Sequence, residues 1–479
     1  MNPPFKPVFP IALLVVTLLA GCVAPKEPPA SDPTGLIEET LSFGYTCPPG
    51  DTLTLSNGLC VTTFQDARET FEEPYIAVRP DRPETMVVGM NSWHAEPRPT
   101  LIGGFPSMEL GRVALFVTED GGATWTRVQS PPILYGTDRV GKTSYSGDPT
   151  LAFDSRGVLH YFQTSVAFDD VGGPAFPYLD IQYARSEDLG ASWSKNVLIA
   201  DDGDNDRPWL TIGRDDHLFA TWRNNMVEAK PPSLTWSQDG GTTWEIHPAP
   251  PGCTDTGRAI VHGDAVLMPC ALAEEESKVQ VNRFEPATRR FEPVSQIPVP
   301  EGDPTYNHAQ WDVSPDGAVL ALGARTDSPH GFVVFSRDSG AGWSEPLLFT
   351  KLCACQPETG ALHLYGMKFD AWGAVHLLLT DAMVGPDQVD ENRKRYTTGE
   401  RGVFHVVIDA DGNALHTQRL PTSIEEDPRV PPTMAAPFGR DDYYIPAFWD
   451  GGGAIAWTRD KGIDLAHVVV DGSADAPSG

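Results

Sequence analysis

From residue 65 to residue 470, short apolar runs alternate with clusters of Gly, Pro, Asp and Ser. Most runs are four or five residues long and rich in β-branched and aromatic residues, which is too short for a helix and typical of a β-strand. Five such runs are Val113–Val117, Ile181–Ala184, Ser233–Trp236, Phe332–Phe335 and Ala454–Trp457. The 45 Gly and 45 Pro among 479 residues also disfavour long helices, so the chain is predicted to be all-β.

The predicted strands group into longer repeat units. Three units open with a residue that precedes a proline, at Glu73-Pro74, Asp148-Pro149 and Arg207-Pro208. Four more open near Gly257, His308, Tyr365 and Pro432, with second strands predicted at 265–268, 318–322, 374–379 and 443–448. Unit lengths of about 50 to 75 residues fit a four-stranded propeller blade with insertions. We therefore predict a β-propeller of seven four-stranded blades over residues 65–470, or six blades if one unit has been split.

An eight-residue turn of the form Ser/Thr-x-Asp-x-Gly-x-Ser/Thr-Trp follows the third strand of several units. Its Asp and Trp residues are Asp120 and Trp125, Asp188 and Trp193, Asp239 and Trp244, and Asp338 and Trp343. The last of these copies has Gly342 at the second hydroxyl position, and a fifth copy, at 458–462, lacks the Trp. In such a turn the Asp accepts backbone N–H bonds, the Gly adopts a positive φ and the Trp packs on a neighbouring hairpin.

This turn resembles the Asp box, or BNR repeat, of the sialidase superfamily, and the resemblance covers most of the chain. It implies structural Asp boxes on one face of a propeller and a functional site on the opposite face. Sialidases hold a carboxylate with three Arg and use a Tyr nucleophile, a Glu that activates it and an Asp acid/base. The first Arg would fall at Glu72-Glu73-Pro74, where acids stand instead, so we expect the catalytic set to be incomplete.

The N-terminal residues are typical of an export signal. Residues 1–7 carry Lys6 and no acid, and Val8–Ala20 is apolar but too short for a permanent membrane span. Leu19-Ala20-Gly21-Cys22 resembles a bacterial lipobox, which predicts a signal peptide over 1–21, lipidation of Cys22 and a Pro-rich tether over 22–40. An ordinary secretion signal is the alternative. Val23 in place of an Asp favours the outer over the inner membrane, by resemblance to bacterial sorting rules.

Residues 41–64 are predicted to form a cap or an edge strand that completes the ring, and 471–479 a flexible tail. Export permits disulfides. Cys47 with Cys60, and Cys253 with Cys270, are predicted to pair locally. Cys353 and Cys355 are separated by one residue, where a direct disulfide would be strained, so their connectivity stays open.

Charge narrows the range of partners. The chain has 35 Lys and Arg against 65 Asp and Glu, a net charge of −30. This argues against a nucleic-acid binder and against a polybasic membrane-surface protein, so membrane contact is expected through the N-terminal lipid only. It also disfavours an anionic ligand, although a local Arg pocket could reverse that preference.

The candidate functional residues lie at the unit starts and in long loops on the same face. The binding candidates are Trp93, His94, Arg207, Arg223, Arg258, Arg325, His308 and His363. Glu73, Asp148 and Asp206 align at the starts of successive units, where they could hydrolyse a neutral glycan or cap their strands. Tyr443 and Tyr444 are candidate nucleophiles. Other histidines within second strands, such as His160 and His376, are interpreted as packed.

Asp202, Asp204 and Asp206 alternate as at the start of a calcium loop, so Ca²⁺ is a candidate cofactor, with a solvated acidic turn as the alternative. Together the sequence predicts a lipid-anchored protein of the bacterial cell envelope whose propeller binds a glycan or protein ligand through its loop face. The alternatives are an exo-glycosidase, either a divergent sialidase or a neutral-glycan hydrolase, and an envelope assembly scaffold. Whether the protein is an enzyme stays open.

Overall fold

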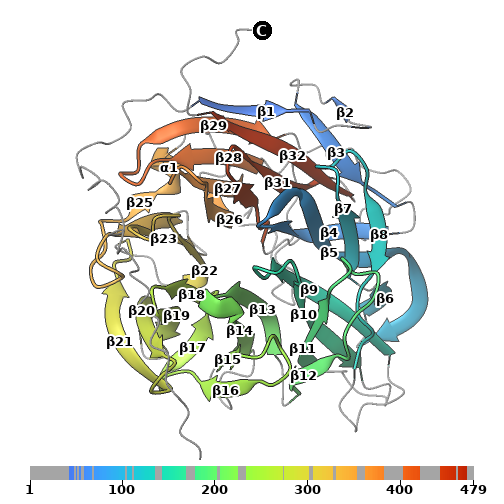
Figure 1. Cartoon of the computed structure of the whole chain (residues 1–479), viewed down its shortest axis with the longest axis horizontal. Coiled ribbons are helices and arrows are strands. Elements are labelled where there is room, and N and C mark those ends of the chain that lie inside the picture. Colours follow the sequence, from blue (N-terminus) through green and yellow to red (C-terminus); the bar gives the residue numbers. More distant parts are fainter. Residues whose placement is uncertain are drawn as a thin grey trace, which may run out of the picture.

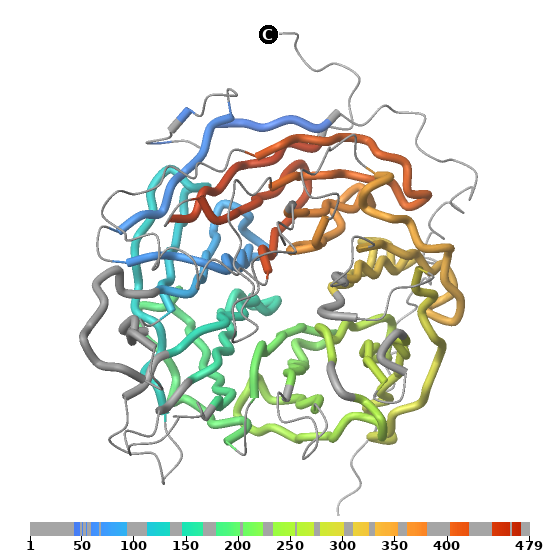
Figure 2. Tube along the Cα trace, turned by 180° about the vertical axis from the view of Figure 1, so that it is seen from behind, coloured from blue at the N-terminus to red at the C-terminus, as the bar shows by residue number. Residues whose placement is uncertain are grey.

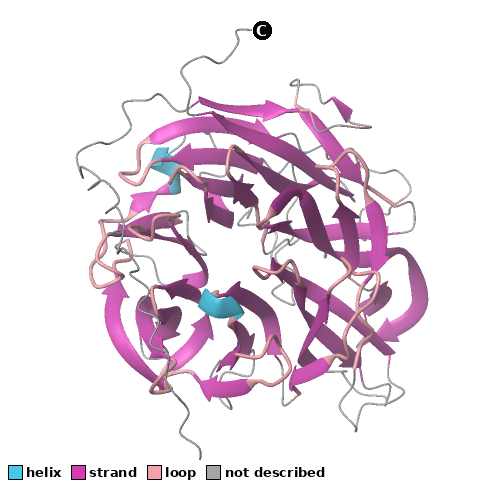
Figure 3. Ribbon diagram, viewed as in Figure 1, coloured by secondary structure: helices cyan, strands magenta, loops and turns pink. Residues whose placement is uncertain are grey.

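The structure is a computed structural model that describes residues 42–47, 50, 53–54, 59–66, 69–102, 105–110, 113–134, 143–168, 178–201, 205–224, 233–272, 275–300, 306–326, 331–352, 362–381, 403–420, 443–459 and 462–471. Within these ranges almost all regular structure is β-strand (Figure 3). The exceptions are the four-residue helix α1 (Phe349–Leu352) and the 3-10 turn η1 (Arg214–Asp216). The all-β prediction is confirmed.

The strands form seven antiparallel sheets arranged as a ring, each with its first strand nearest the axis (Figure 1). Blade 1 contains β4 (Glu69–Arg79), β5 (Arg82–Ile102), β7 (Ala114–Thr118) and β8 (Thr126–Gln129), with β6 (Phe105–Leu110) added to β5. Blade 2 contains β9 (Thr143–Phe153), β10 (Leu159–Phe168), β11 (Tyr178–Ser186) and β12 (Val197–Ala200). Blade 3 contains β13 (Asn205–Ile212), β14 (Leu218–Asn224), β15 (Ser233–Ser237) and β16 (Glu245–Pro248).

The remaining blades follow the same order. Blade 4 has a divided first strand, β17 (Cys253–Thr256) and β18 (Ile260–His262), then β19 (Ala265–Leu272), β20 (Glu275–Glu285) and β21 (Arg290–Ile297). Blade 5 contains β22 (Tyr306–Val313), β23 (Leu320–Thr326), β24 (Phe332–Ser336) and β25 (Leu347–Leu348). Blade 6 contains β26 (Leu362–Phe369), β27 (Val375–Asp381), β28 (Val403–Ile408) and β29 (Ala414–Leu420).

Blade 7 combines both ends of the described chain and closes the ring. Its inner strands are β30 (Ala447–Trp449), β31 (Gly452–Arg459) and β32 (Gly462–Asp471). The outer strand comes from the N-terminal side: β3 (Cys60–Phe64) and β1 (Ser42–Thr46) both pair with β32, and β2 (Leu53–Thr54) pairs with β3. In Figure 2 these blue N-terminal strands lie along the red C-terminal ones.

Seven blades, rather than six, are confirmed, but the assignment of strands within blade 7 was wrong. A second strand was predicted at 443–448, whereas β30 there is the first strand and β31 the second. The turn at 458–462, predicted to follow a third strand, therefore lies between the second and third strands. Because β1 and β3 supply the outer strand, the C-terminal part of the chain needs only three strands.

The hydrophobic core lies between neighbouring blades. Phe162, Tyr183 and Leu210 pack between blades 2 and 3, and Phe332, Leu364 and Val406 between blades 5 and 6. The Trp residues of the repeated turns extend this packing outward. Trp193 donates its Nε1–H to the carbonyl of Gln129 in the preceding blade, and Trp244 stacks edge-on against Phe162. Each blade is thus held mainly by its neighbours.

Candidate functional site

The two faces of the ring differ in the turns that they carry. Because neighbouring strands are antiparallel, the turns from first to second strand and from third to fourth strand lie on one face, here called the turn face. The loops from second to third strand and the connections between blades lie on the other, the loop face. The four repeated turns that keep the Trp follow β7, β11, β15 and β24, which are third strands, so they belong to the turn face.

The aspartates of the repeated turns are engaged within their own turns. Asp120, Asp188, Asp239 and Asp338 each accept a hydrogen bond from the backbone N–H four residues later, at 2.7–2.9 Å. Hydrogen bonds from the side chain and backbone of Thr124, and then from Thr118, lower the pKa of Asp120 to about 2. Asp409 of blade 6 accepts the backbone N–H of Asn413 in the same way. This turn has no Trp, and sequence reasoning missed it. These carboxylates stabilise turns.

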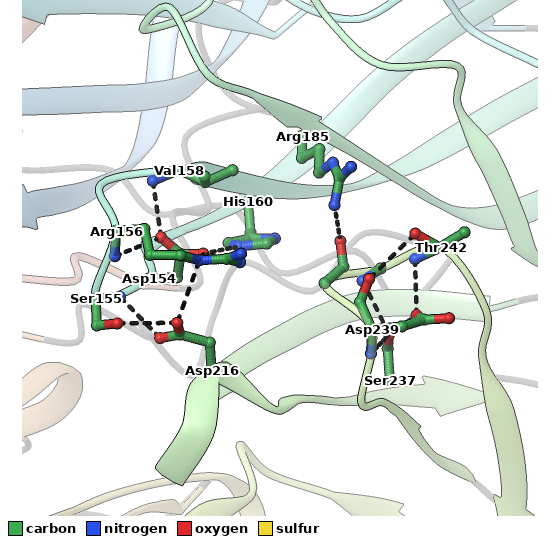
Figure 4. A network of polar contacts seen from close by, with 12 residues as sticks. Asp154, Ser155, Arg156, Val158, His160, Arg185, Asp216, Ser237, Asp239 and Thr242 are labelled. Carbon is green, nitrogen blue, oxygen red and sulfur yellow. Dashed lines mark hydrogen bonds and ion pairs between the residues drawn. The ribbon is translucent and has the colours of Figure 1, made fainter.

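Turn-face residues also tie blades 2 and 3 together (Figure 4). Asp216 of η1 accepts hydrogen bonds from the Ser155 backbone N–H and hydroxyl at 2.8 and 2.9 Å. Arg185 donates to the carbonyl of Gly240, inside the repeated turn of blade 3, at 2.7 Å. Asp154, which is fully buried, accepts from the backbone N–H of Val158. The polar groups in this network bond to turns of the two blades and hold them together.

At the loop face, the first strands of blades 1, 2 and 3 contain an extra residue that shifts their pairing with the second strand. Glu73, Asp148 and Arg207 sit in these bulges with φ of 56°, 51° and 51°, each just before a proline. Residues other than Gly rarely adopt this left-handed conformation, and bulges re-aim side chains next to functional sites. Arg207 is therefore the counterpart of Glu73 and Asp148. The sequence alignment that placed Asp206 there was off by one residue.

Asn91, in the middle of β5 and paired with Glu72 of β4, joins two of these bulges. Its Nδ2 donates to Glu73 Oε2 at 2.6 Å and to Asp148 Oδ1 at 3.3 Å, and its Oδ1 accepts the backbone N–H of Asp148 at 2.7 Å. Because both carboxyl oxygens bond to one nitrogen, they lie within about 6 Å of each other, close to the separation in retaining glycosidases. Glu73 and Asn91 are both buried. One amide thus fixes two acids from neighbouring blades.

Asp148 is the acid whose protonation is most perturbed. Burial raises its pKa to about 7, aided by the charge of the Asp206 carboxylate and a hydrogen bond to it, while Arg207 and Asn91 act in the opposite direction. Thr164 of the adjacent strand donates to Asp148 Oδ2 at 3.3 Å. Asp206 also accepts the backbone N–H of Arg207 at 3.0 Å. A carboxyl group that holds its proton near neutral pH can act as a general acid.

Aromatic residues pack next to the acids, around the axis of the ring. Tyr75, Trp209 and Tyr443 belong to one buried cluster, and the rings of Trp209 and Tyr443 are 5.3 Å apart. The pKa of Tyr161, in the same cluster, is raised mainly by burial and further by the nearby Asp148 carboxylate. The three acids and this aromatic cluster come from blades 1, 2, 3 and 7. We call Glu73, Asn91, Asp148, Asp206 and Arg207 the acid–amide cluster.

The candidate nucleophiles Tyr443 and Tyr444 are packed in the core. Tyr443 is 3% exposed and Tyr444 is 2% exposed. Their backbone runs between two blades: Tyr444 N–H donates to the Tyr365 carbonyl of blade 6, and Ile445 N–H to the Pro74 carbonyl of blade 1. A Cβ at position 366 would lie 1.9 Å from the backbone carbonyl oxygen of Tyr444, so only glycine fits at Gly366.

The arginine candidates are spread over several blades. Arg258 lies between β17 and β18, where its Nε donates to Thr211 Oγ1 at 3.2 Å and its charge lowers the pKa of Tyr75 against the larger effect of burial. In the strand register, Arg223 of β14 stands opposite Asp206 of β13, and Arg325 of β23 stands opposite Asn307 of β22. His363, in β26, is buried. Sequence reasoning missed Lys368, which donates to Asp312 at 3.0 Å on first strands of blades 6 and 5.

Several predicted sites are only partly described. Cys22, Asp202, Asp204, Cys353 and Cys355 lie outside the described residues, and for Trp93, His94, His308 and Arg325 the structure describes the backbone only. Cys47 bonds to Cys60 and Cys253 bonds to Cys270. Within the described ranges, no group of three or more His, Cys, Asp or Glu could hold a metal ion. No helix in that part of the chain is long and apolar enough to cross a membrane.

The chain matches no protein-family model and no curated protein sequence. Among solved structures it is similar to a protein of unknown function from Dyadobacter fermentans, with 12% identity, a TM-score of 0.48, and coverage of 90% of this chain and 100% of that one. It is similar to the GH74 xyloglucanase from Xanthomonas campestris, with 16% identity, a TM-score of 0.42, and coverage of 78% and 56%. It is also similar to a Trypanosoma rangeli sialidase, with 13% identity and a TM-score of 0.38; the match covers 90% of this chain and 59% of the sialidase.

This chain therefore spans less than two thirds of the length of the xyloglucanase and of that sialidase. Similarity at this level concerns the arrangement of propeller blades, and no activity follows from it. Here the seven-bladed fold rests on the strand order itself.

Proposed function

We propose that this protein is a carbohydrate-binding propeller of the bacterial cell envelope, anchored through Cys22, whose ligand binds at the acid–amide cluster. The observation that carries the proposal is that Glu73 and Asp148, in two strained bulges on the loop face, are joined by the Asn91 amide. Carboxylates and an amide are groups that bind sugar hydroxyls. Strained backbone with buried polar groups is typical of a functional site.

A binding measurement tests this proposal. The full-length chain, purified in detergent, would be titrated with neutral and sialylated oligosaccharides and followed by calorimetry. Neutral glycans are expected to bind, because the cluster carries three carboxyl groups against one arginine and would repel an anion. Asn91→Ala should weaken binding at least tenfold because both acids lose their shared partner. Asp338→Asn, in a repeated turn of the opposite face, should leave the affinity unchanged.

A second function, glycoside hydrolysis, is favoured by the protonation of Asp148 and its closeness to Glu73. In a retaining reaction, Asp148 would give its proton to the glycosidic oxygen as the C1–O bond breaks, and a Glu73 oxygen would bond to C1. Water would then lose a proton to Asp148 and attack C1, which releases Glu73 and returns both carboxyl groups to their starting states. The role of Asp206 would be to keep the proton on Asp148 between turnovers.

Hydrolysis is tested with fluorogenic neutral glycosides and a fluorogenic sialoside. Turnover of a neutral substrate should fall as pH rises through about 7, because the acid form of Asp148 is lost. Asp148→Asn should lower kcat by about 10² to 10⁴-fold with little change in KM. Neutral-glycan binding without turnover on any substrate would leave the binding function and exclude this reaction for the glycosides tried. Turnover of the sialoside alone would contradict the preference for neutral sugars.

A further inference from the structure

A chain of hydrogen bonds runs through the interior of blade 6 to β1, the most N-terminal strand of the described residues. Asp370 Oδ2 lies 3.1 Å from His376 Nε2, His376 Nδ1 lies 2.8 Å from His405 Nε2, and His405 Nδ1 lies 2.7 Å from the Tyr45 hydroxyl. His376 and His405, on β27 and β28, are fully buried. Tyr45 is on β1. The chain thus joins a turn-face carboxylate to the N-terminal strand.

The hydrogen-bonding order of this chain is fixed if both histidines are neutral. The Tyr45 hydroxyl then donates to His405 Nδ1, His405 Nε2–H donates to His376 Nδ1, and His376 Nε2–H donates to the Asp370 carboxylate. Each imidazole uses one donor and one acceptor, so every polar atom in the chain is satisfied without a charge on either ring. A buried polar network of this kind is stable only while it stays fully satisfied.

The groups packed around the two histidines offer little support for a positive charge. From β1, the Phe43 ring packs edge-on against His376 with 5.7 Å between ring centroids, and from β30 the Phe448 ring lies 3.9 Å from the His376 ring. From β29, His416 stands 6.1 Å from His405 and 5.9 Å from Tyr45. The facing titratable groups in the described residues are Asp370, His416 and Tyr45. Asp370, the carboxylate among them, contacts His376, at the end of the chain remote from β1.

Burial keeps the two histidines uncharged at neutral pH. It lowers the pKa of His405 well below the usual range, and the neighbouring His376 and His416 add to the effect. Burial lowers the pKa of His376 although Asp370 acts against it, and it lowers the pKa of His416. Burial also raises the pKa of Tyr45, which therefore keeps its proton as a donor.

We propose that Tyr45, His405 and His376 form an acid-sensitive latch, which holds β1 on blade 6 while both histidines are neutral and releases β1 when a proton enters the chain. A proton on His376 Nδ1 turns that atom into a donor, so His405 must move its own proton to Nδ1. Tyr45 must then accept instead of donate, and its O–H loses its acceptor in a partly buried site. A second proton would set two N–H donors against each other.

The direction of the pH effect follows from the lowered pKa values. An exposed histidine has a pKa of about 6.5, and the buried ones lie below that. The state with β1 released therefore takes up protons first, and it gains in population as pH falls below about 6.5. The latch is closed above that value. Release frees the segment that pairs as Ser42–Thr46 with Asp471–His467 of β32.

Hydrogen exchange of the full-length chain, read by mass spectrometry, tests the latch. Peptides covering residues 42–46 would be compared between pH 7.5 and pH 5.5, after correction for the intrinsic pH dependence of exchange. We expect their protection to fall at least tenfold at the lower pH, while peptides from β11 in blade 2 keep theirs. His405→Gln should abolish the fall, because Gln can bond to both neighbours but does not titrate over this range.

The matched control is His247→Gln, because His247 in β16 is also partly buried with a lowered pKa but is not part of the chain. This variant should show the wild-type fall in β1. Protection of 42–46 that does not change with pH in the wild type, or an equal fall in His405→Gln, would overturn the proposal. If His405→Gln fails to fold, the wild-type comparison decides: loss confined to β1 supports the latch, and equal loss in β11 contradicts it.

Discussion

Blades 2 and 6 contain the same interior motif with different endings. In both, an aspartate ends the first strand and a histidine stands six residues later on the second: Asp154 with His160, and Asp370 with His376. In blade 2 the histidine Nδ1 meets the Tyr183 hydroxyl at 2.7 Å, and Tyr183 donates to the Gly240 carbonyl of blade 3. In blade 6 the residue on the third strand that contacts His376 is His405, and His405 in turn contacts the Tyr45 hydroxyl.

The difference shows how one substitution changes what a blade can respond to. Tyr183 is uncharged at physiological pH, because burial raises its pKa further above the usual value of about 10, and its partner is a backbone carbonyl that cannot titrate. The blade 2 chain is therefore a fixed tie between neighbouring blades. His405 places a titratable group at the same point of blade 6, and its chain ends on a strand at the edge of the ring closure.

The largest expected effect separates the two aspartates. Asp370→Ala should destabilise the protein by about 3 kcal/mol or more, because it leaves His376 and the backbone N–H groups of Trp372 and Ala374 without their acceptor. Asp154→Ala should cost less, because its partner Arg156 is exposed and can be hydrated, and its contact with His160 is longer at 3.4 Å. Chemical denaturation of both variants measures the difference. An equal loss would contradict the ranking.

The two tyrosines should differ in pH dependence. Tyr183→Phe is expected to cost about 1 to 2 kcal/mol at pH 8 and at pH 5.5 alike, since it removes a bond to a buried carbonyl. Tyr45→Phe is expected to cost about 1 kcal/mol at pH 8 and much less at pH 5.5, where the latch is already open. Thermal unfolding at the two pH values provides the test. A pH-independent cost for Tyr45→Phe would remove the distinction between the blades.

The smallest expected effect concerns the other end of blade 2, where Asp148 responds to pH in the opposite sense. Its pKa is raised to about 7, so the stability due to its protonated form is lost as pH rises from about 4 through 7. Asp148→Asn should therefore gain about 1 kcal/mol relative to the wild type between pH 6.5 and pH 8. Unfolding midpoints across this range, with Asp154→Asn as the matched variant, measure the sign. A relative loss at pH 8 would show that Asp148 is not protonated in the folded protein.

Local patterns were enough to predict the architecture. Short β-branched runs and the repeated turns at Asp120, Asp188, Asp239 and Asp338 identify strands and hairpins because both depend on neighbouring residues only. The strand order of blade 7 could not be predicted this way, since its outer strand lies about 400 residues away along the chain. The bulges were not predicted, and Asp206 was aligned with Glu73 and Asp148 although Arg207 is the residue that precedes the proline and occupies the bulge.

The candidate site was predicted in outline. Glu73 and Asp148 stand out because each precedes a proline at the start of a unit. Asn91 carries no such signal, because its role arises from a contact with Asp148 across two blades, 57 residues apart. His160 and His376 were interpreted as packed, and they are, but their hydrogen-bond chains depend on Tyr183, His405 and Tyr45 from other strands. Periodicity shows which face a residue takes and does not show its partner.

The closure of blade 7 by both ends of the chain has a consequence for how the protein is made. Thr63 in β3 bonds to Asp464 in β32, a separation of 401 residues. At synthesis rates of about 5 to 20 residues per second, the first strands exist for on the order of half a minute before their partner is made. During that interval β1 and β3 are unpaired strand edges, open to pairing with other chains. The six blades between them can assemble earlier, and we expect the docking of the N-terminal strands onto β32 to be the last step of folding.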